Sequence, residues 1–316
     1  MAKVTVIVLA FQHEAFIGRC LESVLAQRTR HELEILIGED GSTDATGALC
    51  DAYAARDPRI TVFHRGTVEK WRIEGHVTGR RNCLELIRTA TGEFVTLLDG
   101  DDGWLDPGRI DAQVDLLLAD PAAAGCYHHT LIMDEAGRSQ GRWRAHLPER
   151  MGLDKCIAPI APFHTSSFLW RHTGTMRALL TEGDAWTAGS YDMYLFACAA
   201  LQGDLVRYDA DASFYLKHGA GISSSGLFAR SNIHRLRILQ WLRMDKATGN
   251  RWHDRIIDLC DRHLREVRSP VPWKDGRLWL RTIAQQPGYF LRPWRTRSLL
   301  SHIRKGLFMP VPSSRI

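Results

Sequence analysis

Short apolar runs alternate with amphipathic segments through the first hundred residues. The apolar runs cover residues 4–11, 33–37, 60–63 and 94–98, each the length of one strand. Between them, apolar side chains recur at helical spacing over residues 16–25, 49–53 and 83–87. Strand, helix, strand and helix at this spacing predict βαβ units and a parallel sheet that is covered on both faces.

Polar residues follow three of these predicted strands at the point where each strand ends. They are Phe11-Gln12, Glu39-Asp40 and Asp99-Gly100-Asp101-Asp102. Ligands of an open parallel sheet bind beyond the carboxyl ends of its strands, so we expect these groups to meet at one edge. Ser42 or Thr43 is expected to cap the helix that follows the second strand.

The acidic cluster places three carboxylates within four positions, at Asp99, Asp101 and Asp102. Like charges this close repel one another unless a positive group lies among them. Carboxylate oxygens are hard ligands that suit Mg²⁺ or Mn²⁺, and such an ion commonly holds a substrate phosphate. A solvated acidic turn after a strand is the alternative interpretation.

Three further residues, which are far apart in the sequence, have two interpretations each. Phe11 can stack on a nucleobase or belong to the core, and Asp40 can accept a hydrogen bond from a base N–H or close a turn. Arg81, at the start of a helix, can neutralise phosphate or lie on a solvated face.

The second half of the chain predicts fewer regular elements. Residues 126–133 look like a strand, whose adjacent His128 and His129 point to opposite faces and so are interpreted as structural rather than as ligands of one metal ion. Residues 141–150 are polar and suggest a loop over the site, and residues 163–171 suggest a strand with small hydroxyls at its centre. Residues 206–209 and 213–216 predict two short strands.

Composition is that of an ordinary globular protein. The 316 residues are 45% hydrophobic and 24% charged, and the net charge of +5 permits an anionic partner without identifying one. The seven cysteines are scattered, with no CxxC pair, which predicts free thiols in a reducing compartment and no zinc site. With no basic-then-apolar leader and no apolar run long enough to span a membrane, a cytoplasmic location is expected.

Several segments together resemble family 2 glycosyltransferases. They are VTVIVLAF (4–11), CLESVLAQ (20–27), EDGSTDAT (39–46), Arg81-Asn82, TGEF (91–94) and LDGDD (98–102), in the order and at the gaps of that family. Two departures are Leu9-Ala10-Phe11-Gln12, where the family usually has Pro-Thr-Tyr-Asn, and Glu39-Asp40, where it often has two aspartates.

The resemblance implies an α/β GT-A fold, with a mostly parallel nucleotide-binding sheet flanked by helices. Residues 1–225 would be the GT-A domain, divided into a nucleotide-sugar-binding half (1–105) and an acceptor-binding half (106–225). It also implies an inverting, metal-dependent transferase of the hexosyltransferase type that uses Mn²⁺ or Mg²⁺. The site residues that it implies are Ala10, Phe11, Gln12, Asp40, Arg81, Asp99, Gly100, Asp101, Lys217 and His218 for the nucleotide sugar, Asp101 and His218 for the metal, Asp192 as catalytic base, and Thr165 and Ser166 for the acceptor.

Asp192 lies at the start of an apolar helix, where a carboxylate is also stabilised by the helix dipole. In the resemblance it is the base. Inverting transfer is a single displacement, and the attacking hydroxyl must lose its proton as the new bond forms. The metal held by Asp101 would stabilise the leaving nucleotide diphosphate.

Residues 226–316 predict an α-helical, basic C-terminal extension. After Asp275 there is no further acid, and arginines are interleaved with aromatic residues. Such a region either contacts an anionic membrane surface, at the inner face of the membrane where a lipid-linked acceptor would lie, or packs on the core with a solvated basic face.

The expected reaction moves a sugar from a nucleotide-diphosphate donor, with UDP the first choice of nucleotide, to a glycan or lipid-linked glycan in cell-surface polysaccharide synthesis. The rival hypotheses are a nucleotidyltransferase, which would release pyrophosphate, and a catalytically inactive scaffold. The scaffold hypothesis includes a nucleic-acid binder, whose affinity would fall steeply with salt. The transferase hypothesis expects no nucleic-acid partner.

Overall fold

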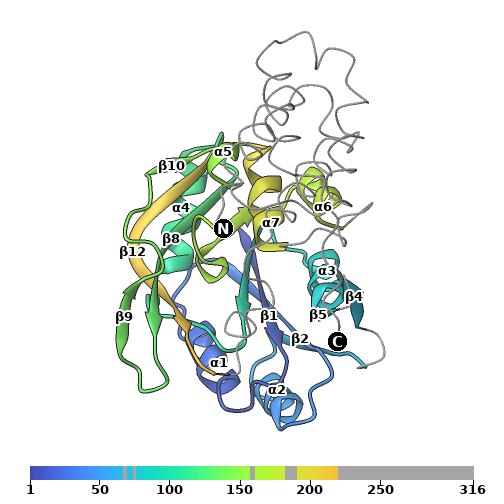
Figure 1. Cartoon of the computed structure of the whole chain (residues 1–316). Coiled ribbons are helices and arrows are strands. Elements are labelled where there is room, and N and C mark those ends of the chain that lie inside the picture. The colour runs from blue at the N-terminus through green and yellow to red at the C-terminus, as the bar shows by residue number, and fades with distance from the viewer. Residues whose placement is uncertain (67–69, 74–75, 157–160, 182–190, 220–316) are drawn as a thin grey trace, which may run out of the picture. The chain divides into compact units, whose positions relative to one another are not determined.

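The computed structural model describes residues 1–66, 70–73, 76–156, 161–181 and 191–219, all within one compact unit (Figure 1). The predicted C-terminal extension and the proposed membrane contact lie outside the described residues. The predicted domain boundaries stay predictions, and so does the cytoplasmic location. Among the described helices, none is long and apolar enough to cross a bilayer.

Ten strands of the described chain form one mixed sheet, in the order β10-β12-β8-β11-β6-β1-β2-β3, with β7 paired to β12 and β9 to β8. The strands are β1 (Lys3–Ala10), β2 (Glu32–Glu39), β3 (Ile60–His64), β6 (Phe94–Asp99), β7 (Gly103–Trp104), β8 (Gly125–Met133), β9 (Ser139–Arg142), β10 (Arg150–Met151), β11 (Leu169–Arg171) and β12 (Leu205–Leu216). Strands β4 (Trp71–Ile73) and β5 (His76–Thr78) pair in a separate two-stranded sheet. The helices are α1 (Ile17–Leu25), α2 (Thr46–Ala54), α3 (Arg80–Thr89), α4 (Arg109–Ala119), α5 (Leu153–Cys156), α6 (Gly174–Thr181) and α7 (Tyr191–Ala200).

The predicted parallel half is confirmed. Strand β1 pairs in parallel with β2 on one side and with β6 on the other, and β3 continues the parallel order beyond β2. One face of β1, which includes Val4, Val6 and Val8, shares a core with α1, α2 and α4. Helix α3 contacts β1 and β2 as well, and β1 is buried along nearly its whole length. A strand covered on both faces has to be apolar at consecutive positions, which explains the unbroken apolar run.

The second half of the sheet changes direction at β11, which is antiparallel to both β6 and β8. The prediction of one strand over residues 163–171 is wrong. A 3₁₀ turn covers Thr165–Ser167, and only Leu169–Arg171 is a strand. The Ser167 hydroxyl donates to the His164 carbonyl at 2.7 Å, and the Ser166 amide donates to His164 Nδ1 at 3.4 Å. These local bonds compete with a strand ladder, as serine side chains commonly do.

Three smaller expectations are corrected. Residues 205–216 form one strand, β12, which pairs in parallel with β8 through register shifts at Asp211, rather than two short strands. Residues 141–150 are not wholly irregular, because they begin with the end of β9 and end with the start of β10. Helix α2 begins at Thr46 without a cap from Ser42 or Thr43, and Asp44 accepts from the Thr46 amide at 3.0 Å.

Candidate functional site

The ends of three parallel strands meet at one edge of the sheet, as their polar residues predict. In the strand register, Ala10 is opposite Glu39 and Leu9 is opposite Asp99. The Asp40 amide donates to the Ala10 carbonyl at 2.9 Å, and the Gly100 amide donates to the Leu9 carbonyl at 2.8 Å. A Cβ at Gly100 would lie 2.7 Å from His13 Nδ1, so only glycine fits between the acidic cluster and the turn after β1.

Gln12 joins the turns that follow β1 and β2. Its backbone adopts a left-handed conformation with φ of 55°, which non-glycine residues seldom occupy. Its side-chain amide donates to the Thr43 hydroxyl at 2.9 Å, and its carbonyl oxygen accepts from the Thr43 amide at 3.1 Å and the Asp44 amide at 3.3 Å. The Gln12 amide in turn donates to the Ser42 hydroxyl at 3.0 Å. Gln12 therefore holds the two strand-end turns in one fixed arrangement.

Phe11 and Asp40 lie at this edge together with Lys70, which was not predicted as a site residue. The Lys70 ammonium lies 3.3 Å from Asp40 Oδ2 and 3.1 Å from the centre of the Phe11 ring. Phe11 is 42% exposed, so its alternative role as a core residue is excluded. Burial raises the pKa of Asp40, and the Lys70 charge opposes that rise.

The acidic cluster is joined by two histidines. His218 Nε2 lies 2.9 Å from Asp101 Oδ2, so the second residue after β12 reaches the loop after β6. His13 Nε2 lies 3.8 Å from the same oxygen, and the Phe16 ring packs on the His218 ring with their centres 4.5 Å apart. His13 and Phe16 were not predicted as site residues.

The other two carboxylates of the cluster repel Asp101 and each other. Burial, followed by the charge of Asp101, raises the pKa of both Asp99 and Asp102 well above the ordinary aspartate value. Asp102 accepts from the Leu216 amide at 3.1 Å and thereby attaches the end of β12 to the cluster. A cation would relieve this repulsion, which agrees with the expected use of the site.

The fit of a metal ion to these residues is partial. Among the described residues, no group of three or more histidine, cysteine, aspartate or glutamate side chains is arranged to hold one. Asp101 and His218 do lie together, and ions such as Mg²⁺ are commonly bound by one or two carboxylates with the remaining positions filled by substrate phosphates and water. The donor set therefore suits an ion that arrives with a phosphate ligand.

Asp192 lies in the first turn of α7. It keeps solvent-exposed surface, yet the surrounding protein raises its pKa by desolvation, while Arg80 and a hydrogen bond from the Thr165 side chain oppose that rise. Its charge also contributes to the raised pKa of Asp99. Asp192 and Thr165, which were predicted separately, are thus in direct contact.

Arg80 and Arg81 take different positions at the start of α3. The Arg81 Nε donates to Glu85 at 2.7 Å, one helical turn further on. Arg80 is buried, with its guanidinium 4.7 Å from the centre of the Tyr191 ring, and its charge acts on Asp192. Arg81 was the predicted site residue, although the structure places its neighbour Arg80 beside the predicted base.

Buried hydroxyls lie beside the acidic cluster. The Ser166 hydroxyl lies 3.1 Å from that of Ser213, which is 2.8 Å from the Thr130 hydroxyl. Ser166 also lies 2.9 Å from His164 Nδ1, which is 3.7 Å from Asp102. Ser166 is therefore held within a buried network, whereas Thr165 contacts Asp192.

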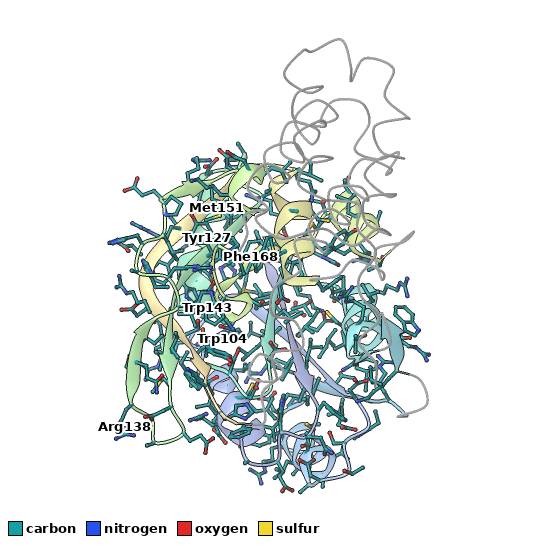
Figure 2. All side chains as sticks on the ribbon, viewed as in Figure 1. Trp104, Tyr127, Arg138, Trp143, Met151 and Phe168 are labelled. Carbon is teal, nitrogen blue, oxygen red and sulfur yellow. The ribbon has the colours of Figure 1, made fainter. Side chains whose placement is uncertain are left out.

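Aromatic side chains surround this network. The rings of Trp143, His164 and Tyr215 lie within 5.2 Å of one another, centre to centre. Trp104 donates its indole N–H to the Ser166 carbonyl at 3.0 Å; Figure 2 labels Trp104 and Trp143. These aromatic residues come from segments far apart in the sequence, so no single motif could predict the cluster.

The remaining predicted residues have simpler surroundings. Lys217 follows β12 with an exposed side chain, and its amide donates to Met133 at 2.8 Å. His128 and His129 are buried with lowered pKa values, which agrees with a structural role. Six of the seven cysteines are described, and all six are buried free thiols.

The site residues that were not predicted differ in how clearly the sequence indicates them. Asp102 belongs to the acidic motif itself, and Arg80 adjoins Arg81, which was predicted. Both could therefore have been predicted as site residues. His13 lies two residues beyond Phe11 in the same turn. Lys70 follows the third strand without any motif, and nothing in the sequence pairs it with Asp40.

Solved structures share the fold of this chain, and one of them is a mannosyltransferase. The mannosyltransferase PcManGT from Pyrobaculum calidifontis, in complex with GDP-Man and Mn²⁺, has a TM-score of 0.55 at 16% identity, covering 97% of this chain and 87% of that one. S. aureus TarS 1-349, in complex with UDP-GlcNAc, has a TM-score of 0.54 at 17% identity, covering 96% and 89%. At these identities the likeness shows the fold, which is the GT-A fold.

The sequence relatives of this chain include a named glycosyltransferase. An uncharacterized protein of Mycobacterium tuberculosis is 26% identical over 295 residues, which are 90% of this chain and 80% of that protein. Glycosyltransferase GlyG of Streptococcus pneumoniae is 32% identical over 99 residues, 31% of this chain and 30% of GlyG. The family described as Glycosyl transferase family 2 matches residues 5–177, more than half of the chain. The chain therefore belongs to glycosyltransferase family 2, with a GT-A fold and a role in glycosyl transfer.

Proposed function

We propose that this protein transfers a sugar from a nucleotide-diphosphate donor to a hydroxyl acceptor, with inversion at the anomeric carbon. The observation that carries the proposal is the meeting of three groups at one sheet edge. Phe11 and Asp40 are suited to a nucleobase, Asp101 and His218 to a diphosphate with its metal ion, and Asp192 to the reacting hydroxyl.

The donor would extend along the strand ends. Its base would stack on the exposed Phe11 ring and donate an N–H to Asp40, and its ribose and diphosphate would lie by Asp99 and Asp101. Ala10, Gln12 and Gly100 would contribute backbone that approaches the nucleotide closely. Arg81 and Lys217 would add positive charge near the diphosphate.

Asp192 would act as the general base. Its raised pKa makes it a better proton acceptor than an ordinary aspartate, and Arg80 and Thr165, which oppose the rise, favour its ionised form. As the acceptor oxygen attacks the anomeric carbon, its proton passes to the Asp192 carboxylate. The bond from that carbon to the diphosphate oxygen breaks, and the nucleoside diphosphate leaves from the opposite face.

A divalent ion, Mn²⁺ or Mg²⁺, would supply charge stabilisation to the leaving diphosphate. Asp101 and His218 are the residues that would hold it, because their side chains are adjacent. The positive ion would also relieve the repulsion among the nearby carboxylates. The neighbouring PcManGT structure contains Mn²⁺ with GDP-Man, and that of TarS contains UDP-GlcNAc, which supports a nucleotide-sugar donor here. We take a UDP-sugar as the first donor and a glycan or lipid-linked glycan of cell-surface polysaccharide synthesis as the acceptor.

The test is a thermal-shift screen of sugar nucleotides with and without Mn²⁺, on the wild type and Asp101→Ala. A ligand that binds only the folded state raises the melting temperature by mass action. We expect a shift for at least one nucleotide that depends on the metal and is lost in Asp101→Ala. No shift for any sugar nucleotide in the wild type would overturn the proposal.

A further inference from the structure

Three successive backbone carbonyls, two of them in the 3₁₀ turn Thr165–Ser167, each accept a hydrogen bond from a buried side chain. The pairs are Trp104 Nε1 with the Ser166 carbonyl at 3.0 Å, Gln113 Nε2 with the Ser167 carbonyl at 2.9 Å, and the Thr96 hydroxyl with the Phe168 carbonyl at 2.8 Å; Figure 2 labels Trp104 and Phe168. We call Thr96, Trp104 and Gln113 the anchoring side chains. They come from β6, β7 and α4, so three distant segments fix this one turn.

Arg109, on α4, contacts all three anchoring side chains. Its Nη2 donates to Gln113 Oε1 at 2.5 Å and to the Thr96 hydroxyl at 3.3 Å. Its guanidinium lies 4.0 Å from the centre of the Trp104 ring, where a cation is attracted by the face of the ring. One guanidinium therefore links the side chains that hold the turn.

The charge of Arg109 is fully buried, which is unfavourable in itself. Burial lowers its pKa to about 9, so the guanidinium stays protonated at neutral pH. Its Nε and Nη1 have no hydrogen-bond partner in the described part of the chain, and a buried charge with unpaired donors costs free energy. The hydrogen bonds that it does make go to Gln113 and Thr96, which points to a role in placing them.

The turn brings Thr165 to the proposed base. A hydrogen bond from the Thr165 side chain favours the ionised form of Asp192 and lowers its pKa. The other charged or titratable groups that interact with Asp192 are Arg80 and Cys83 on α3 and Asp99 at the end of β6. None of these three lies on the turn, so the Thr165 hydrogen bond is what connects the turn to Asp192.

We propose that Arg109 is a positioning residue for the transfer reaction, because it holds the anchoring side chains in place and the turn that they fix keeps the Thr165 hydroxyl on the Asp192 carboxylate. Arg109 thus acts on the proton transfer from within the core, without touching the substrate. This inference rests on the proposed function, in which Asp192 is the base.

The first measurement is the pKa of Asp192, taken by NMR from the titration of its ¹³C-labelled carboxyl group, with Asp192→Asn to identify the signal. Thr165→Val removes the hydrogen bond directly and should raise this pKa by about one unit. Arg109→Met should raise it by about half a unit or more. The variant that carries both substitutions should show no larger shift than Thr165→Val alone, because both act through the same bond.

Arg171→Met is the matched control. Like Arg109, Arg171 lies over an aromatic ring, that of Phe94, and it donates to the Ala123 carbonyl at 2.8 Å. Within the described structure none of its hydrogen bonds reaches an anchoring side chain. Arg171→Met should therefore leave the pKa of Asp192 unchanged, even where it lowers the stability of the protein.

Trp104→Phe tests the same chain of contacts without removing the buried charge. It keeps an aromatic ring for Arg109 but lacks the N–H from which the Ser166 carbonyl accepts. It should raise the pKa of Asp192 in the same direction as Arg109→Met. It replaces Arg109→Met in the experiment if circular dichroism shows that Arg109→Met does not fold.

The second measurement is the pH profile of kcat. A base works in its ionised form, so a raised pKa of Asp192 moves the acidic limb of the profile to higher pH. At a pH below that limb, Arg109→Met should lose about threefold to tenfold in kcat. Well above the limb, its kcat should stay close to that of the wild type, and its affinity for the sugar nucleotide should be unchanged.

The outcomes separate this inference from the proposed function. An unchanged pKa of Asp192 in folded Arg109→Met, or in Trp104→Phe where it replaces that variant, would overturn the positioning role and leave the transferase proposal intact. A double variant whose shift is the sum of the two single shifts would do the same. The expected pKa shifts in a protein whose wild type turns over no sugar nucleotide would overturn the transferase proposal, and with it the inference that these contacts serve catalysis.

Discussion

The two halves of the candidate site are built in different ways. The proposed donor side consists of the ends of β1, β2 and β6, with Phe11, Asp40 and Asp101 in the loops that follow. The proposed acceptor side consists of the 3₁₀ turn Thr165–Ser167, which precedes β11, and the start of α7. The donor side is parallel sheet with turns tied by side-chain bonds to backbone, whereas the acceptor side is a junction of antiparallel strand, turn and helix.

This difference has a functional consequence. The turns of the donor side are fixed by Gln12 before any ligand arrives, which favours tight and specific binding. On the acceptor side, Asp192 keeps exposed surface and a raised pKa, which favours proton transfer. Substitutions on the two sides should therefore separate binding from turnover.

Asp192→Asn should produce the largest effect. Asparagine keeps the size of the side chain but cannot take the acceptor proton, so we expect turnover to fall by about 10²–10⁴-fold. Donor affinity should stay nearly unchanged, because Asp192 belongs to the acceptor side. Steady-state kinetics together with calorimetric donor binding would measure both quantities.

Asp154→Asn is the matched control, since Asp154 also lies in the first turn of a helix, α5. It should retain wild-type turnover. A fully active Asp192→Asn variant would show that Asp192 is only a helix-start residue and that the division between the two sides is misplaced.

Gln12→Ala should have the second-largest effect, and it should change donor affinity rather than turnover. The variant loses the bonds that join the turns after β1 and β2, which we expect to weaken donor binding by about tenfold and to destabilise the protein by about 1–2 kcal/mol. The kcat at saturating donor should change little. Calorimetry and urea unfolding would measure the two losses.

The comparison for Gln12→Ala is Gln140→Ala, on the exposed strand β9. This control should leave both donor affinity and stability unchanged. Wild-type donor affinity in Gln12→Ala would mean that the turns keep their arrangement without the glutamine, and the donor side would then not be fixed in the way described.

The same division explains what the sequence could predict. The donor side was predictable because each of its groups directly follows an apolar strand, and parallel strands bring such positions to one edge. His218 was placed by family resemblance, and its contact with Asp101 across more than a hundred residues agrees with that placement. Positions that a local sequence pattern determines, such as residues at strand ends, can therefore be predicted from that pattern.

The acceptor side was less predictable because its geometry depends on tertiary contacts. Residues 163–171 have the composition of a strand, but the bonds of His164 with Ser166 and Ser167 make a 3₁₀ turn. That turn is what brings Thr165 to Asp192. At the start of α3, both arginines were available, and the structure places Arg80, whose guanidinium lies over the Tyr191 ring, where its charge acts on Asp192.

Arg80→Gln should give the smallest effect and tests how the two sides are coupled. The positive charge of Arg80, on a helix that packs against the donor-side strands, lowers the pKa of Asp192 on the acceptor side. Without that charge, the already raised pKa of Asp192 should rise further. A base works in its ionised form, so activity is lost as pH falls through this pKa, and the acidic limb of the kcat profile should move to higher pH.

The rate well above that limb should stay close to that of the wild type, because Arg80 acts through the ionisation of Asp192 rather than on the substrate. Arg80→Lys keeps the charge and should leave the limb nearer to its wild-type position. If Arg80→Gln lowered the rate equally at all pH values, Arg80 would serve the folding of α7 or contact the substrate, and the electrostatic coupling between the two sides would be absent.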